Sequence, residues 1–320
     1  MSFDHDIVQR ARDLAPIIRE TADEAEAQRH LPARAAQAMA EAGLHRVAAP
    51  ATVGGLECTP ETQVRVIEAI SEAGGAAGWT LMIGIEALGV VGAALSAESA
   101  AEVVGDPNVI ICGALNPLGR AEPVQGGYRI SGQWPFASGC HNADWFHGQC
   151  IVYDGDERRL EDDGRVFLRE MLVPRDEFRI VDTWKVSGLR GSGSHDVAVD
   201  DVFVPDHHVT AITNQGLVAE GPLYRMPLLT RLAYNKVGVA TGIARGAINQ
   251  FIDLASDKTP RGATNLLRER PQAQIALADA EALLESGRAY LFQTLSQVWQ
   301  ACLAGEEITR EQRAILQIAA

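Results

Sequence analysis

The strongest constraint on the fold is the order in which hydrophobic periodicity changes along the chain. Residues 5–27, 228–256 and 271–304 place apolar side chains at the three- and four-residue spacing of amphipathic helices. Between about Asn108 and Pro205 the pattern changes to short, β-branched, partly alternating runs separated by Gly, Asp and Asn, which is typical of antiparallel strands. Helices and strands in separate blocks predict an α+β architecture rather than alternating α/β units.

These blocks predict three domains. They are an N-terminal helical domain (1–107), a middle antiparallel β domain (108–222) and a C-terminal helical bundle (223–320). Thr309 is a possible N-cap of a last helix, and the chain reaches Ala320 without a C-cap signal. We therefore expect the bundle to be truncated.

Composition excludes some classes of partner. The 320 residues contain 28 Lys and Arg against 42 Asp and Glu, a formal net charge of −14, so we expect no nucleic-acid partner. The most apolar stretch, Leu81 to Leu95, is interrupted by Glu86 and is shorter than a membrane span, which favours a buried helix and no membrane association. The charged N-terminus lacks the apolar core of a signal peptide, and five irregularly spaced cysteines favour free thiols in a reducing, cytoplasmic compartment.

Segments from most of the chain, taken in order, resemble the acyl-CoA dehydrogenase superfamily, and most of all its oxygen-using branch, the two-component flavin-dependent monooxygenases. The matching segments are 42–57, 112–145, 183–209, 228–256 and 266–284. The resemblance implies a non-covalent flavin, FAD or FMN, held between the β domain and the helical bundle. It also implies a homotetramer in which bundle residues of a neighbouring subunit help to hold the flavin.

In that branch the chain is the oxygenase component. A separate flavin reductase supplies reduced flavin, which reacts with O2 so that a small organic substrate, such as an aromatic compound, is hydroxylated. The flavin carries the covalent chemistry, and the protein supplies shape and hydrogen bonds and keeps water away from the flavin–oxygen adduct.

Two other interpretations stay open on sequence alone. An FAD-dependent acyl-CoA dehydrogenase needs a carboxylate base. The usual Thr-Glu-Pro motif is replaced by residues 116–120, and no carboxylate lies between Leu223 and Gln250, so the monooxygenase is favoured. The other interpretation is a non-catalytic, flavin-free relative that acts as a partner subunit.

The segment WPFASG, residues 134–139, is the first predicted flavin contact. The resemblance implies that Trp134 packs against the flavin ring and that Ser138 lies beside N5, with Phe136 and Gly139 also in contact. A hydrogen bond at N5 tunes proton loss there, so Ser138 is also a predicted catalytic residue. The alternative is an ordinary, tightly packed strand end.

The glycine-rich segment GLRGSGSHD, residues 188–196, precedes a strand, so it is neither a Rossmann turn nor a P-loop. The resemblance implies that Arg190, Ser192 and Ser194 contact the flavin, and the alternative is a glycine-rich β connection. Residues 194–196 are not a catalytic triad, because three consecutive side chains entering a strand do not converge.

The C-terminal helices complete the predicted site. Arg231 lies in the first turn of a long helix, where the resemblance implies contact with an anionic substrate or the flavin and a catalytic role; the alternative is a surface charge. Arg261 and Gln272 match the spacing at which dehydrogenases contact the pyrophosphate of a neighbouring subunit's flavin, although Thr264-Asn265 replaces the usual Phe-Gly. An exposed basic loop is the alternative.

No metal site is predicted. Residue types that suit zinc are found at Cys140, His141, His147 and Cys150. His147 and Cys150 stand three apart in a predicted strand and so point to opposite faces. His207 and His208 follow Val-Pro-Asp at a strand exit, where we expect them to be exposed to solvent.

Overall fold

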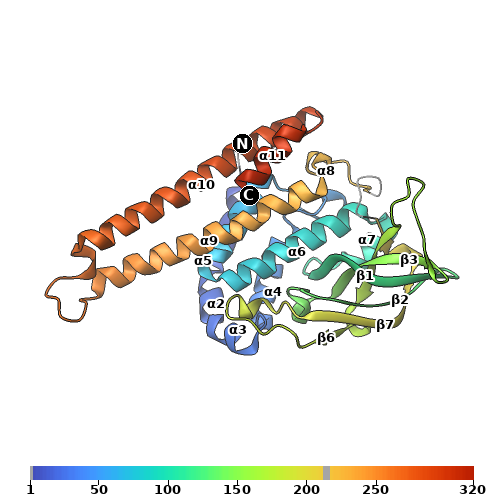
Figure 1. Cartoon of the computed structure of the whole chain (residues 1–320), viewed down its shortest axis with the longest axis horizontal. Coiled ribbons are helices and arrows are strands. Elements are labelled where there is room, and N and C mark those ends of the chain that lie inside the picture. The colour runs from blue at the N-terminus through green and yellow to red at the C-terminus, as the bar shows by residue number, and fades with distance from the viewer. Residues whose placement is uncertain (1–2, 212–216) are drawn as a thin grey trace.

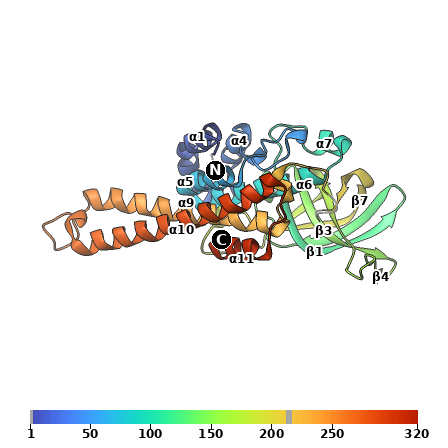
Figure 2. The same ribbon diagram turned by 90° about the horizontal axis from the view of Figure 1, so that it is seen from above.

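The computed structural model describes residues 3–211 and 217–320. The strands form one body beside the helices, and two long helices project as a hairpin at the end of the molecule opposite the sheet (Figure 1, Figure 2). The predicted α+β order is confirmed, since helices come first, the sheet follows and further helices end the chain.

The first helical segment is divided, so the prediction of a single helix over residues 5–27 is wrong. Pro16 lies in the first turn of the second piece and has no N–H for the helical ladder, which interrupts the helix near Leu14. Thr21 ends that piece and donates its hydroxyl to the Ile17 carbonyl (2.8 Å). The resulting helices are α1 (His5–Asp13), α2 (Ala15–Glu20), α3 (Ala22–Gln28) and α4 (Ala33–Glu41).

Three further helices precede the sheet: α5 (Pro60–Ala73), α6 (Gly75–Ala94) and α7 (Ala97–Val103). Thr59 caps α5 by accepting a hydrogen bond from the Thr62 N–H, and Pro60 takes the first helical position. Helix α6 is apolar on all sides and by length and composition is able to cross a membrane, but 83% of its most apolar window is buried inside the protein. The prediction of a buried core helix is confirmed.

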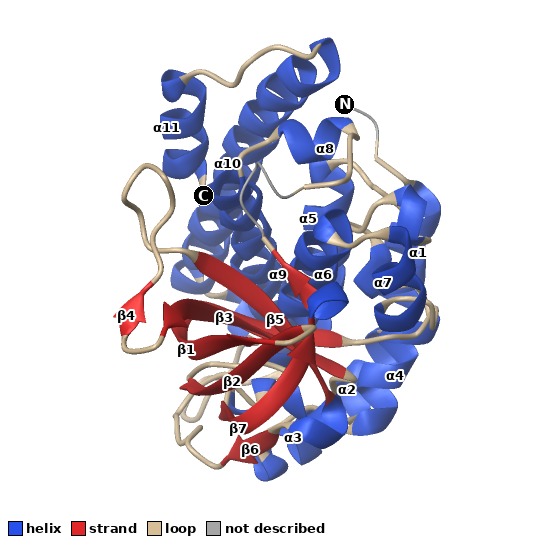
Figure 3. Cartoon of the chain, turned by 90° about the vertical axis from the view of Figure 1, so that its right-hand side faces the viewer, coloured by secondary structure: helices blue, strands red, loops and turns tan. Residues whose placement is uncertain are grey.

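The sheet places the parallel strands β1 and β3 side by side among otherwise antiparallel pairs (Figure 3). Its strand order is β6-β7-β2-β1-β3-β5-β8, and β4 pairs with β3. Residues 125–126 form a hairpin turn between β1 and β2, with Gly126 at a φ of +81°. The strands are β1 (Ile111–Val124), β2 (Gly127–Trp134), β3 (Trp145–Asp154), β4 (Glu157–Arg158), β5 (Leu168–Pro174), β6 (Arg179–Val181), β7 (Asp196–Pro205) and β8 (Val209–Thr210).

The C-terminal helices are α8 (Pro222–Arg225), α9 (Leu228–Asp257), α10 (Pro271–Ala304) and α11 (Arg310–Ala319). Thr309 caps α11 in a capping box with Gln312, as predicted. Helix α9 packs closely on α5, because a Cβ added at Gly242 would lie only 2.5 Å from the Glu68 carbonyl oxygen. This contact joins the N-terminal and C-terminal helices into one layer beside the sheet.

We expect Tyr234→Phe to reduce the free energy of unfolding by about 1–2 kcal/mol. The Tyr234 ring is fully buried and its hydroxyl donates to Oε1 of buried Gln63 (3.0 Å), an acceptor that phenylalanine leaves unpaired. Urea unfolding measures the change. Tyr290→Phe is the matched control, because that ring is 42% exposed; an equal loss in both variants would contradict the assignment.

Candidate active site

A cavity of about 790 Å³ lies where the sheet meets α6 and α9. Its walls come from α6, the first residues of β1, the loop after β2, the segment around Trp184–Ser194, and the first turns of α9. This volume is within the range of cofactor and ligand sites, and the walls are mainly apolar with a few polar groups, as in such sites generally.

A chain of three buried serines forms the polar part of the sheet-side wall. The Oγ atoms of Ser192 and Ser194 are 2.8 Å apart, and those of Ser194 and Ser138 are 2.7 Å apart. The indole N–H of Trp79 donates to Ser138 Oγ (3.0 Å). Because a hydroxyl has one donor and two acceptor positions and rotates freely, Ser138 has its own proton to donate either to Ser194 or into the cavity.

The backbone around these serines is strained and tightly held. Among the described residues, five non-glycine residues have positive φ, and two of them, Phe136 (φ +63°) and Leu189 (φ +53°), line the cavity. Ala137 N–H donates to the His195 carbonyl (2.9 Å) and Gly139 N–H to the Ser192 carbonyl (3.0 Å), so the two loops hold each other in place. Strain of this kind concentrates at functional sites.

His147 on β3 contributes an imidazole to the wall. Its Nδ1 lies 3.1 Å from Oε2 of Glu170 on β5, and Gln149 donates to the other oxygen of the same carboxylate (2.7 Å); Glu170 and His147 are both buried. A Cβ added at Gly113 on β1 would lie 2.0 Å from the imidazole, so glycine is required there for the ring to reach the cavity.

Glu86 on α6 is a carboxylate on the helical wall. Nζ of Lys236 on α9 lies 3.1 and 3.2 Å from its two oxygens. Burial raises the pKa of Glu86 to about 7, and the favourable interaction with Lys236 only partly offsets that effect. The carboxylate is therefore partly protonated at neutral pH.

Arg231 lies behind Glu86 rather than on the main cavity. It borders a small void of about 20 Å³ that Glu86 and Asn235 also line, which is enough room for a single water molecule. The guanidinium is buried, and no described residue accepts a hydrogen bond from its Nε or Nη2. Burial lowers its pKa from the usual high value of arginine.

The predicted site residues divide into two groups. Phe136, Ser138, Ser192 and Ser194 line the cavity together. Trp134 does not: its side chain is fully buried in the core of the sheet and its indole donates to the Gln149 carbonyl (2.9 Å). The Trp134 ring is therefore not available to pack against a flavin in the cavity, and that prediction is corrected.

Four other predicted contacts also lie outside this chain's cavity wall. Gly139 supports the serine loop through its backbone, and Arg190 donates to the Glu26 carbonyl (3.0 Å) on the far side of its own loop. Arg261 and Gln272 are exposed, in the turn and the first residues of α10 at the tip of the projecting hairpin (Figure 1).

Sequence reasoning missed Glu86, His147 and Lys236 as cavity residues. The sequence does contain a signal that Glu86 has a special role, because Glu86 is a lone carboxylate in the most apolar stretch of the chain. His147 and Cys150 point to opposite faces of β3, as predicted, with Cys150 in the core of the sheet. His207 is exposed as expected, but His208 is buried, so that expectation is wrong for His208.

Comparison with known proteins agrees with this geometry. The family model for the acyl-CoA dehydrogenase N-terminal domain matches residues 5–100, and that for the C-terminal domain matches residues 235–320. The chain is 34% identical to the indole-3-acetate monooxygenase of Pseudomonas putida over 282 residues, which is 88% of this chain and 70% of that protein. It is 31% identical to the HsaA oxygenase subunit of a flavin-dependent monooxygenase from Rhodococcus jostii, over 96% of this chain and 80% of that protein.

A solved structure, that of the 3-HSA hydroxylase from Rhodococcus sp. RHA1, superimposes with a TM-score of 0.86 at 29% identity, covering 99% of this chain and 81% of that one. Fold and cavity thus define a flavin-dependent oxidoreductase. The chain belongs to the acyl-CoA dehydrogenase superfamily, in its flavin-dependent monooxygenase branch. It is an oxygenase component, which uses reduced flavin and O2 and depends on a flavin reductase, so the predicted family, fold and enzyme class are confirmed.

We compare the free energy of unfolding of the native protein with that of Glu86→Gln. We expect the difference, native minus variant, to fall by roughly 3 kcal/mol as the pH rises from about 4.5 to about 7. In this window the unfolded chain ionises Glu86 while the folded protein keeps it protonated, so rising pH favours unfolding. Urea unfolding of both proteins across the window measures the difference. Glu98→Gln on the surface of α7 is the control, and a difference between native protein and Glu86→Gln that does not change with pH would contradict the raised pKa.

Proposed function

We propose that the cavity holds the reduced flavin against Ser138, Ser192 and Ser194 and that a small aromatic substrate is hydroxylated between the flavin and helices α6 and α9. The observation that carries this proposal is the buried serine chain, which ends at the cavity wall and is the main polar feature of its sheet side. A flavin ring has two apolar faces and a polar edge. The apolar wall suits the faces, and the small hydroxyls on that wall suit the edge. When bound, the flavin supplies the activation of O2 and the transfer of one oxygen atom.

Ser138 is the residue that we assign to the reactive edge of the flavin. Its oxygen already accepts the Trp79 indole N–H, so its own proton is free to reach the flavin when Ser194 donates to it instead. The neighbouring residues keep Ser138 in place, because the backbone N–H groups of Ala137 and Gly139 on either side of it donate to the loop that carries Ser192.

The largely apolar walls of the cavity limit the contact of a bound flavin with water. Trp79, Ile83, Leu232 and other apolar side chains form most of the wall, and Phe136 packs edge-on against Trp184 with ring centroids 6.3 Å apart. Phe136 is 64% exposed, so this pair lies at the rim of the cavity. An apolar environment strengthens the hydrogen bonds that are made inside it.

The helical wall favours an aromatic substrate with an acidic group. Lys236 and Arg231 supply two cations against the single, partly protonated carboxylate of Glu86, so the cluster carries net positive charge. One relative is an indole-3-acetate monooxygenase, whose named substrate is an aromatic carboxylate. On the sheet side, Glu170 orients the His147 imidazole, which places a further hydrogen-bonding group in the cavity.

The assembly remains a prediction, as do the domain boundaries at 107 and 222 and the cytoplasmic location. Exposed apolar residues along the projecting hairpin support a homotetramer. The hairpin extends away from the sheet (Figure 2). Arg261 and Gln272 lie at the turn between its two helices, away from this chain's own cavity, where they are available to a neighbouring subunit's flavin. The exposed apolar residues are Ile252, Leu254, Ile275 and Leu283.

We expect Ser138→Ala to bind reduced flavin roughly tenfold more weakly and to release more H2O2 per turnover, because a hydrogen bond to the flavin edge contributes about 1–1.5 kcal/mol. Anaerobic titration with reduced FMN and with reduced FAD measures binding. A flavin reductase is then added, and the amounts of product and of H2O2 formed per NADH consumed are measured. Their ratio reports how well flavin oxidation is coupled to hydroxylation. Ser256→Ala is the control, because Ser256 is a partly exposed serine away from the cavity whose hydroxyl donates to the Ile252 carbonyl within α9.

Failure of the native protein to bind either reduced flavin would overturn the proposed function and support the flavin-free alternative. Reduction of a bound flavin by an acyl-CoA in the absence of O2 would instead support the dehydrogenase.

We expect Lys236→Met to raise the KM for indole-3-acetate by roughly tenfold or more while leaving the KM for indole nearly unchanged, because only the former presents a carboxylate to the lysine. Steady-state kinetics with both compounds measure the contrast. Lys258→Met is the control, because Lys258 is exposed beyond the end of α9. An equal rise in KM for both compounds would show that Lys236 acts on the shape of the cavity rather than on substrate charge.

A further inference from the structure

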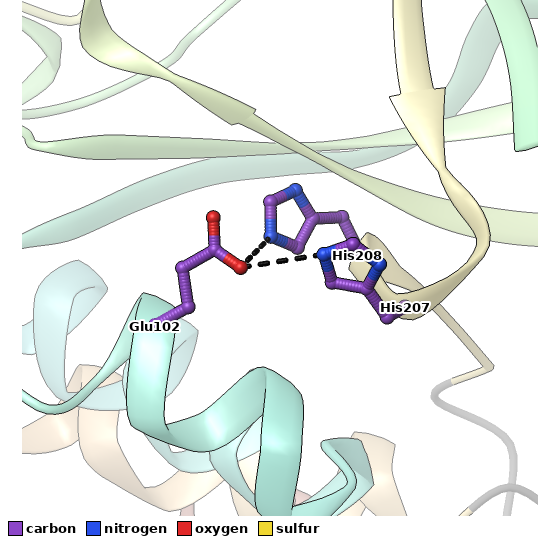
Figure 4. A group of neighbouring side chains, drawn as sticks. All are labelled: Glu102, His207 and His208. Carbon is purple, nitrogen blue, oxygen red and sulfur yellow. Dashed lines mark ion pairs between the residues drawn. The ribbon is translucent and has the colours of Figure 1, made fainter.

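Three metal-ligating side chains converge away from the cavity. Glu102 lies on α7, and His207 and His208 lie on the short 3-10 helix Asp206–His208 between β7 and β8. Nε2 of His207 is 3.3 Å from Oε2 of Glu102, and Nε2 of His208 is 3.0 Å from the same oxygen (Figure 4). Figure 4 shows the three side chains turned toward one another from facing elements.

The buried histidine of this group has no aligned hydrogen bond at its Nε2 atom. The His208 imidazole is buried, with 7% of its side chain exposed, and its Nε2 has no hydrogen-bond partner among the described residues although the Glu102 oxygen is 3.0 Å away. A hydrogen bond requires the N–H to point along the line between donor and acceptor. The Nε2 atom of His208 is therefore available as a ligand for an ion that the Glu102 carboxylate also contacts.

The three ligand atoms lie within 4.8 Å of one another, and two of their separations are those of a metal-ligand set. Nitrogen and oxygen ligands lie about 2.0–2.1 Å from Zn²⁺ in a tetrahedral site, which places neighbouring ligand atoms about 3.3 Å apart. The two separations of 3.0 and 3.3 Å agree with that spacing. Two imidazoles and one carboxylate are a donor set that suits Zn²⁺ and its neighbours in the first transition series.

The surrounding contacts position the His208 ring and the backbone of His207. The His208 ring packs edge-on against Trp145 of β3 at a centroid distance of 5.1 Å and an interplanar angle of 82°. Ser99 lies on α7 one turn before Glu102, and its hydroxyl donates to the backbone carbonyl of His207. This hydrogen bond joins α7 to the 3-10 helix that carries both histidines. Ligands that are already positioned lose little conformational freedom when an ion binds.

We propose that Glu102, His207 and His208 bind a divalent transition-metal ion of the Zn²⁺ class, with three protein ligands and a fourth position for water. None of the three lines the described cavity, so the ion joins α7 of the N-terminal helices to the sheet and stabilises their contact rather than taking part in hydroxylation. This site was not predicted from the sequence. The two histidines were expected to face solvent, and no acidic partner was identified for them.

Isothermal titration of the full chain with ZnSO4, after removal of metals with EDTA, tests the proposal. We expect one strong equivalent of Zn²⁺ and a rise in the thermal unfolding temperature when it binds. Glu102→Gln and His207→Gln change exposed side chains and leave folding intact, and each is expected to weaken that equivalent at least tenfold and to abolish the rise. Flavin binding by the same variants is expected to stay unchanged, which separates this test from the proposed function.

His5→Gln is the control, since His5 is an exposed histidine on α1. Co²⁺ provides an independent measurement, because three protein ligands and one water give the intense visible absorption of a four-coordinate site. A native protein that takes up no Zn²⁺, or uptake that is the same in the native protein, Glu102→Gln and His207→Gln, would overturn the proposal.

Discussion

The burial of α6 on all sides is the constraint on which the rest of the structure depends. A helix of 20 residues with apolar side chains around its whole circumference is stable in water only when other elements cover every face. Helix α5 and α4 cover one side, α9 another, and β1 and the glycine-rich loop the remainder. The sheet and the C-terminal helices are therefore brought together around α6, and the cavity is the space that they leave along it.

Within this apolar setting the few polar groups act in pairs. Ser138 is held by Trp79, His147 by Glu170, and Glu86 by Lys236. A buried polar group without a partner is costly, and a satisfied one is rigid because the low dielectric strengthens its hydrogen bonds. Each pair joins two different elements, so the positions of the cavity's polar groups follow from the packing of those elements. This is the kind of preorganisation that an enzyme needs when its cofactor carries the covalent chemistry.

Prediction from the sequence succeeded where the signal is local. Two short segments that resemble a known family contain Ser138, Ser192 and Ser194, and these serines meet at one wall, while their contact with a flavin stays a prediction. Trp134 was misplaced because residue type alone does not say which face of β2 its ring occupies, and the pairing of β2 with its neighbours directs the ring into the core of the sheet. His208 was misplaced for a similar reason, since Trp145 of a distant strand covers it.

The sequence by itself determined the order of helices and strands, the cap at Thr309 and the buried nature of α6, because these depend on periodicity and on neighbours within a few residues. Only the tertiary structure decided which polar residues share a wall. Glu86 meets Lys236 across 150 residues of chain, and Glu102 meets His207 across more than one hundred. Contacts at such separation depend on how whole elements pack, and no local pattern in one sequence records them.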